Sequence, residues 1–356
     1  MTLVVVAAAC SSAPSAATAP PTCAPPAPPD LTKTSGWVGH IAASPGSTTF
    51  VVEDGRGGVL AHGPDQPMPL ASAAKVVHVA AYGRAVAEGR VRPDETVTVA
   101  DWERWYLAGN DGGAHATALR RLRVGPTATV DQLVSAMIQE SDNSAADWLR
   151  ARLGDDALVR AAAEGGWNAV DLPSFLGAGI ALSLPVQAPP PDAPRSLRGP
   201  AEAALARRYA DDPAYREQVQ RAQAAQQADI PRFLQLNEAW AAWTATGTAT
   251  QLAGMYRALA TGSFGPGTDV ARRQLEFAGP LSGGRGTFGF KGGSYVGVLT
   301  AGGELHRVDG TVGVTVLLAR ELGPATLDPQ VQEAHQSVYL GALTRPETFG
   351  RLACVA

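Results

Sequence analysis

The sequence predicts a mixed fold of the α/β (α+β) class, with an antiparallel sheet flanked by helices and a separate helical subdomain. Three observations carry this prediction. The last third of the chain has the two-residue period of strands, the middle has amphipathic helical periodicity, and a strand pair precedes both. With 356 residues, 45% of them apolar, the chain can form two domains, or one large domain with tails.

The N-terminus has the features of an export signal. The apolar run from Leu3 to Ala9 is too short to span a bilayer but has the length of a signal-peptide core. Small residues before Cys10, followed by Ser- and Pro-rich sequence, resemble a bacterial lipoprotein signal of the actinobacterial type. That resemblance implies a signal peptide over residues 1–9 and lipid on Cys10. Because no Lys or Arg precedes the run, an unprocessed apolar tail is the alternative.

A proline-rich linker follows, over residues 10–34. Seven prolines between residues 14 and 29 predict an extended spacer, on the order of 50 Å long. We therefore expect an extracytoplasmic protein that is anchored to the cell membrane by lipid, or a secreted one. Cys23 and Cys354 lie at opposite ends of the expected domain, and a disulfide between them fits an oxidising compartment. Two unrelated free thiols are the alternative.

The expected domain spans residues 35–356. Residues 36–43 and 48–54 predict a hairpin, residues 69–87 a helix after Pro69, and residues 129–138 and 145–153 two further helices. Residues 174–199 are rich in proline and predict irregular structure. Residues 201–228 predict an exposed helix pair broken near Pro213, so that residues of about 180–230 form a helical insertion. A helix at 250–259, strands at 289–294, 297–300 and 311–320, and a helix at 329–343 complete the chain.

The strongest chemical signal lies in the helix after Pro69. Ser72 and Lys75 are three residues apart, so their side chains share one helical face. A serine beside an amine that can lose its proton is an activated nucleophile. The chain has three lysines among 29 basic residues, which favours a chemical use for Lys75 over a surface position. A surface serine and lysine on an ordinary amphipathic helix are the alternative.

Composition excludes several other classes of protein. The net charge of −4 and the pI near 5.9, without a basic cluster, give no reason to expect nucleic acid. The six histidines have no zinc-site spacing, and no glycine-rich phosphate loop occurs. We expect neither a metal nor a cofactor, and we expect a monomer.

Two further motifs join the first in chain order. They are Ser141-Asp142-Asn143 and, on a predicted strand, Lys291-Gly292-Gly293. The set Ser-x-x-Lys, Ser-Asp-Asn and Lys-Thr-Gly is typical of class A β-lactamases and penicillin-binding proteins, and over residues 35–350 this sequence resembles that superfamily. The resemblance implies a β-lactamase/transpeptidase-like fold and a serine hydrolase.

The resemblance also implies a role for each motif residue. Ser72 would attack the carbonyl of a β-lactam or of a peptidoglycan-peptide-like substrate, and Lys75 would take its proton. Ser141, held by Lys291, would pass a proton to the leaving nitrogen. Asn143 would bind a side amide of the substrate, and the backbone N–H groups of Ser72 and Ser294, beside Gly293, would form the oxyanion hole.

The sequence departs from the family pattern in three respects. The spacing from Ser141 to Lys291 is longer than in a compact class A enzyme, in agreement with the insertion expected at about 180–230. Gly292 replaces the usual hydroxyl residue, for which Ser294 is a substitute. Class A enzymes also use a Glu four residues before an Asn as the deacylating base, and in the corresponding segment Phe233 precedes Asn237. Glu164 and Asn168 have the same spacing, but Glu164 ends a helical run and fits a surface carboxylate better; Glu238 is a weaker substitute.

These observations favour an exported hydrolase that β-lactams acylate at Ser72 and that releases the acyl group slowly, with a link to antibiotic resistance. A D-Ala-D-Ala peptidase or penicillin-binding protein is the alternative enzyme. A non-catalytic, cell-wall-associated lipoprotein on the same fold is the alternative from another class.

Overall fold

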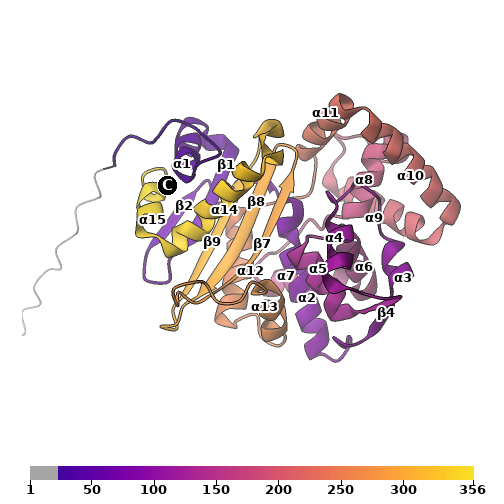
Figure 1. The fold of residues 1–356 in the computed structure, drawn as a ribbon, viewed down its shortest axis with the longest axis horizontal. Helices are drawn as coiled ribbons and strands as arrows, with labels where there is room; N and C mark the ends of the chain where they lie inside the picture. Colours follow the sequence, from indigo (N-terminus) through magenta and orange to yellow (C-terminus); the bar gives the residue numbers. More distant parts are fainter. Residues whose placement is uncertain (1–22) are drawn as a thin grey trace, which may run out of the picture.

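A five-stranded sheet lies at the centre of the fold, and all of its neighbouring strands are antiparallel. The computed structural model describes residues 23–356, so Cys10 and the expected signal peptide lie outside the described residues. The strand order is β2-β1-β9-β8-β7, with bounds β1 Thr48–Glu53, β2 Val59–His62, β7 Thr287–Tyr295, β8 Val298–His306 and β9 Val312–Ala319. The three strands predicted in the last third of the chain are confirmed (Figure 1).

Helices cover both faces of this sheet. Successive residues of a strand point to opposite faces, so each strand contributes side chains to two cores. On β1, Phe50 and Val52 belong to a core shared with α1 Thr34–Ala43 and α14 Pro329–Thr344, whereas Val51 belongs to the core on the other side. That second core includes α12 Ala249–Thr261 and α13 Thr268–Leu275. The helices predicted at 250–259 and 329–343 are therefore confirmed.

The prediction of a strand at residues 36–43 is wrong, because these residues lie in α1. Trp37, Val38 and Ile41 are buried at helical spacing and pack into the core beneath α14. The turn after α1 leads into β1, whose hairpin partner is β2. An apolar stretch of this length fits either element, and packing against α14 decided for the helix.

The helical part stands beside the sheet and is built around α2 Lys75–Ala87. The helices predicted at 129–138 and 145–153 are confirmed, and Thr129 caps the first with a capping box to Gln132. The helix predicted at 69–87 begins later, because Pro69 lies in a short strand and a 3-10 turn precedes α2. Among the helices of residues 23–356, none is long and apolar enough to cross a membrane. The other elements of this part are α3 Val99–Glu103, α4 Ala114–Leu122, α5 Val130–Gln139, α6 Asn143–Leu153, α7 Asp155–Glu164, and the short pairs β3 Met68–Pro69 with β6 Thr246–Gly247 and β4 Thr96–Thr98 with β5 Thr127–Thr129.

Residues 174–199 are less irregular than predicted. They contain α8 Phe175–Ser183, capped by the Ser174 hydroxyl, and the first turn of α9 Arg195–Asp211. The helix break at Pro213 is confirmed, since α10 Pro213–Ala228 starts there and α11 Ile230–Ala241 follows. The pair α9–α10 is also less exposed than predicted, because Leu205, Tyr209, Tyr215 and Val219 form a small core with α8.

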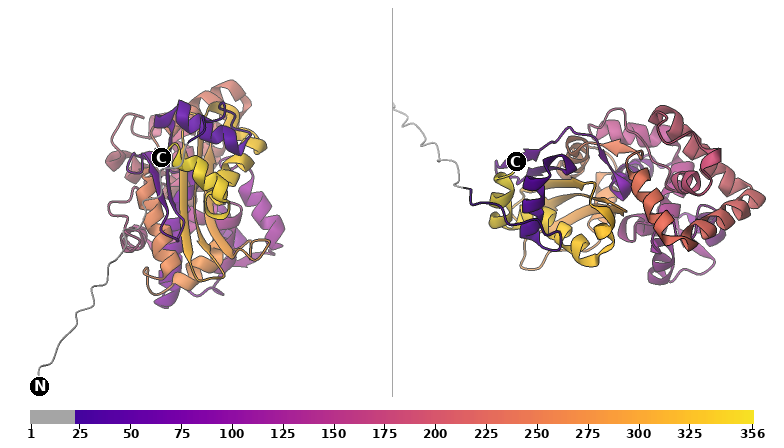
Figure 2. Two further views of the ribbon diagram at one scale, coloured as in Figure 1. Left: turned by 90° about the vertical axis from the view of Figure 1, so that its left-hand side faces the viewer. Right: turned by 90° about the horizontal axis from the view of Figure 1, so that it is seen from above.

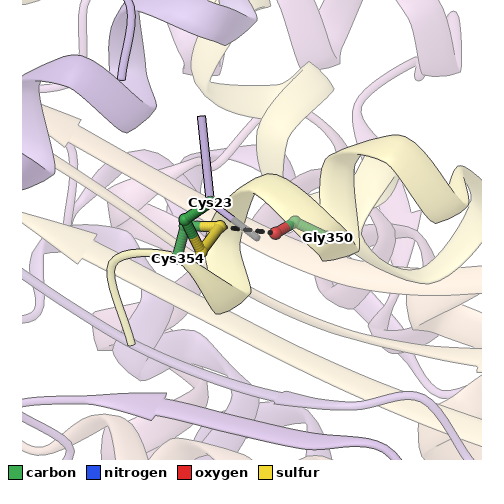
Figure 3. The surroundings of a disulfide bond; sticks show 3 residues. All are labelled: Cys23, Gly350 and Cys354. Carbon is green, nitrogen blue, oxygen red and sulfur yellow. Dashed lines mark hydrogen bonds between the residues drawn. A yellow bond between two sulfur atoms is a disulfide. The ribbon is translucent and has the colours of Figure 1, made fainter. Parts of the chain in front are cut away.

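The two ends of the described chain meet at one edge of the molecule. Cys23 and Cys354, which follows α15 Pro346–Ala353, form a disulfide with Cα atoms 5.6 Å apart (Figure 3). Figure 2 shows the C-terminus beside the indigo N-terminal segment in both views. The predicted pairing of these two cysteines is confirmed.

Candidate active site

Ser72 lies in a short 3-10 turn, Ala71–Ala74, that continues directly into α2. Ala71 has a positive φ of 44°, a backbone conformation that a non-glycine residue rarely adopts. Two distant segments hold the preceding residue: Leu70 N–H donates to Ala245 O at 3.3 Å, just before β6, and Thr300 Oγ1 on β8 donates to Leu70 O at 2.8 Å. The turn is thus fixed against the sheet, with the first backbone N–H groups of the helix free of intrahelical partners.

Lys75 is completely buried, and its amine touches the hydroxyl of Ser72. Nζ donates to Ser72 Oγ at 3.0 Å, to Asn143 Oδ1 at 2.7 Å and to the backbone oxygen of Ser141 at 2.6 Å. Burial lowers the pKa of Lys75 to about 7, against the opposing charges of Asp142, Asp111 and Asp147. A neutral amine is therefore accessible near neutral pH, at hydrogen-bonding distance from a candidate nucleophile.

Ser141 connects the two buried lysines. Its hydroxyl accepts from Lys291 Nζ at 3.0 Å and lies 3.3 Å from Lys75 Nζ. Its backbone is in the left-handed region, with a φ of 70°. The next residue, Asp142, caps α6 through the N–H of Ala145 and contacts buried His115 at 2.8 Å. Asp142 is held by its contacts with Ala145 and His115, and the positive φ of Ser141 leaves the Ser141 hydroxyl between the amines of Lys75 and Lys291.

Lys291 reaches this hydroxyl from β7. Burial and the nearby charge of Lys75 hold the pKa of Lys291 well below its usual range. Gly293, two residues further on the same face of the strand, lies directly against the backbone of Ser72. Ser294 follows on β7 and is exposed to solvent. The structure thus brings together the motif residues Ser72, Lys75, Ser141, Asn143, Lys291, Gly293 and Ser294.

A cavity of about 680 Å³ opens in front of Ser72. Ser141, Asn143 and Ser294 line it together with the loop 109–113, α8, α11 and the end of β7. Phe233 and Asn237 also line it, on α11. Glu164 does not, and instead pairs with Arg84 at 2.7 Å on the surface, as predicted for a surface carboxylate. Glu238 is exposed and also lies outside the lining.

Sequence reasoning missed two groups near this site. The ring of Phe175, on α8, has its centroid 4.4 Å from Lys75 Nζ and lines the cavity. His115 stacks on Tyr106 and contacts Asp142, so it supports the Ser141 turn from behind. Burial opposes protonation of His115, but the hydrogen bond and charge of Asp142 raise its pKa overall. Neither residue belongs to a local motif, and only the fold places them here.

Among the described residues, one cluster has a composition suited to a metal ion. Oxygen atoms of Glu276 and Glu304 and a ring nitrogen of His306 lie within 4.8 Å of one another, away from Ser72. Arg272 already donates to Glu276 at 2.7 Å and lies 3.7 Å from Glu304. The guanidinium of Arg272 therefore already supplies the positive charge that a metal ion would bring to these two carboxylates.

Comparison with known proteins gives a family and a set of related folds. Residues 38–264 match the family described as the β-lactamase enzyme family. No curated protein matches the sequence.

Among solved structures, a β-lactamase from Sphaerobacter thermophilus DSM 20745 is 18% identical with a TM-score of 0.53, over 87% of this chain and 97% of that one. A β-lactamase from Chitinophaga pinensis DSM 2588 is 11% identical with a TM-score of 0.52, over 87% of this chain and 99% of that one. The class A β-lactamase of the last common ancestor of Gram-negative bacteria is 17% identical with a TM-score of 0.52, over 91% and 97%. At these identities the likeness establishes the shared fold.

Proposed function

The chain belongs to the β-lactamase enzyme family, and on this premise we propose that it is an exported serine hydrolase which β-lactams acylate at Ser72 and which deacylates slowly. One observation carries the proposal. The buried amine of Lys75 lies 3.0 Å from the Ser72 hydroxyl, and its pKa is lowered to about 7. Such an amine can take the hydroxyl proton as the oxygen attacks.

The acylation step uses groups already in contact. Ser72 Oγ forms a bond to the β-lactam carbonyl carbon, and its proton moves to Lys75. The negative charge on the carbonyl oxygen is stabilised by the backbone N–H groups of Ser72 and Ser294. The ring C–N bond then breaks, and the nitrogen receives a proton through Ser141, which both lysines contact. Since ring opening releases no fragment, the acyl-enzyme gains the mass of one whole β-lactam.

Slow deacylation rests on the carboxylates near the cavity. Within the described residues, Asp111 and Glu140 line it. Asp111 accepts the N–H groups of Gly113 and His115, and Glu140 is paired with Arg121. Next to Lys75 stands the Phe175 ring, and Phe233 replaces the expected Glu on α11. A missing general base costs a factor of ~10²–10⁴ in rate, which is enough for an adduct to accumulate.

Intact-protein mass spectrometry during incubation with excess benzylpenicillin tests this proposal. We expect the adduct to be present at the first time point after mixing and to persist at later ones. We expect no adduct in Ser72→Ala. Rapid turnover without an adduct would refute slow deacylation, and an adduct in Ser72→Ala would refute the nucleophile. Folded protein that shows neither adduct nor turnover would favour the non-catalytic lipoprotein.

The peptidase alternative has its own readout. A D-Ala-D-Ala peptidase uses the same acylation chemistry but loses the terminal D-alanine as leaving group. Release of D-alanine from diacetyl-Lys-D-Ala-D-Ala, absent in Ser72→Ala, would favour this reading over a β-lactamase.

Export and lipidation are the part of the proposal that rests on the N-terminal sequence. The apolar run before Cys10, the proline-rich linker and the disulfide between Cys23 and Cys354 support it. In a bacterial expression host, Cys10→Ala should release the protein from the membrane fraction or leave its precursor unprocessed. The same distribution for variant and wild type would contradict lipidation.

A further inference from the structure

An apolar face of α11 lines one side of the cavity in front of Ser72. Ile230, Phe233, Leu234 and Trp240 follow one another at helical spacing and line the cavity. These side chains remain partly or largely accessible, Ile230 to 64%. An apolar helix stripe normally packs on a core. This one instead faces an open chamber that continues to the nucleophile.

Contacts at both ends of α11 hold the stripe in this orientation. At the C-terminal end, the Tyr295 hydroxyl on β7 donates to Asn237, and the Trp240 and Tyr295 rings lie 4.9 Å apart. Just before the N-terminal end of α11, Gln227 in the last turn of α10 packs against Gly109 in the loop 109–113. In Figure 1, α11 spans the region between the tips of β7 and β8 and α8. The apolar face is therefore part of the built site.

The charges around the chamber disfavour an anionic occupant. The charged residues among its lining are Asp111 and Glu140, both acidic. Lys75 and Lys291 are turned inward onto Ser141 and are not among the lining residues. A carboxylate placed between Phe175 and α11 would lose water without gaining a cation.

We propose that this chamber binds a bulky, uncharged, apolar group on the acyl side of the substrate. This inference rests on the proposed function. The resemblance of this chain's motifs to class A β-lactamases implies that Asn143 binds the side amide of the substrate, and Asn143 lines the same chamber as the α11 stripe. The substituent on that amide consequently enters the space between Phe175 and α11, while the leaving nitrogen stays near Ser141. The substrate class is an amide or β-lactam with an apolar, uncharged acyl substituent.

Three penicillins with the same nucleus test the inference through their rates of acylation, followed by mass spectrometry. Benzylpenicillin carries a phenyl group, 6-acetamidopenicillanic acid keeps the side amide without it, and carbenicillin adds a carboxylate beside the phenyl. Burial of a phenyl group predicts that benzylpenicillin acylates about 10- to 100-fold faster than the acetamido compound. Carbenicillin should react at least about tenfold more slowly than benzylpenicillin.

Variants of α11 test whether this helix causes the faster acylation by benzylpenicillin. Ile230→Gln and Leu234→Gln should each lower the benzyl-to-acetamido rate ratio by about fivefold or more. Ile230 is exposed, so its replacement removes no core packing. Gln235→Ala, on the outward face of the same helix, is the matched control and should keep the wild-type ratio.

Each outcome decides the matter. Equal rates for benzylpenicillin and the acetamido compound, or an unchanged ratio in both Gln variants, would overturn the apolar chamber while leaving Ser72 acylation intact. Carbenicillin as fast as benzylpenicillin would overturn the requirement for an uncharged group. No acylation by any of the three would refute the proposed function, and the inference with it.

Discussion

Gly293 on β7 and Ser72 at the start of α2 approach each other so closely that a methyl group would not fit between them. A Cβ added to Gly293 would lie 2.5 Å from the backbone nitrogen of Ser72 and 2.8 Å from that of Ala73. The N–H of Ser72 is a proposed oxyanion donor. The absence of a side chain at Gly293 thus keeps the space in front of this N–H open to a substrate oxygen.

This contact predicts that Gly293→Ala disables acylation. The new methyl group must push β7 away from the Ser72 turn or cover the Ser72 N–H. Loss of one oxyanion donor costs ~10²–10³ in rate, so the acylation rate with benzylpenicillin should fall by that factor. Gly292→Ala is the control, since a Cβ there would meet nothing closer than Thr300 O at 3.8 Å. Equal rates in the two variants would contradict the role of Gly293.

The lowered pKa of Lys75 predicts the pH dependence of acylation. The free amine is the base, and below its pKa of about 7 it becomes protonated and can no longer accept the Ser72 proton. The acylation rate should therefore fall about tenfold for each pH unit below 7 and level off above it. Lys75→Arg keeps the charge but cannot deprotonate, and should lose ~10²–10⁴ in rate. A flat profile from about pH 5 to about pH 9 would point to another base.

Phe175 predicts where a deacylating base can be introduced. Its ring touches the amine of Lys75 and lines the cavity, so in Phe175→Glu a carboxylate would lie beside the acyl-enzyme ester. We expect the lifetime of the penicillin adduct to shorten by about 10² or more, as general-base assistance predicts. Phe233→Glu tests the position indicated by sequence, and Phe175→Leu is the uncharged control. An adduct lifetime unchanged in both Glu variants would show that a missing carboxylate is not what limits deacylation.

Glu304 predicts a pH dependence of stability that is independent of the active site. Burial raises its pKa to about 8, with Arg272 opposing and Glu276 adding to the shift. The folded protein therefore holds this proton above the usual pKa of 4.5. The contribution of Glu304 to the free energy of unfolding is full below pH 4.5 and is lost as the pH rises through about 8. The free energy of unfolding should decline there by up to about 1.4 kcal/mol per pH unit.

Denaturant unfolding at several pH values measures this slope. Glu304→Gln keeps a neutral side chain of nearly the same size and should flatten the decline. Glu238→Gln, on the surface, should leave it as in wild type. A decline that persists in Glu304→Gln would assign it to another group.

Much of the candidate site could be predicted because its signals are local. The three-residue spacing of Ser72 and Lys75 places both on one helical turn, and the capping pattern at Thr129 marks the start of α5. The strands after residue 286 could be read from their period alone. The disulfide between Cys23 and Cys354 followed from the scarcity of cysteines in a chain with an export-like N-terminus.

The sequence by itself thus determined the helices at 129–138, 145–153, 250–259 and 329–343, the late strands, and the motif residues and their order, because each depends on neighbours a few residues apart. Only the tertiary structure decided that residues 36–43 form a helix, since packing against α14 overrides an ambiguous apolar run. It alone placed Phe175 against Lys75 and turned the apolar face of α11 toward Ser72. Contacts between segments 100 or more residues apart leave no local pattern, and burial, which lowers the pKa of Lys75, is a property of the folded chain.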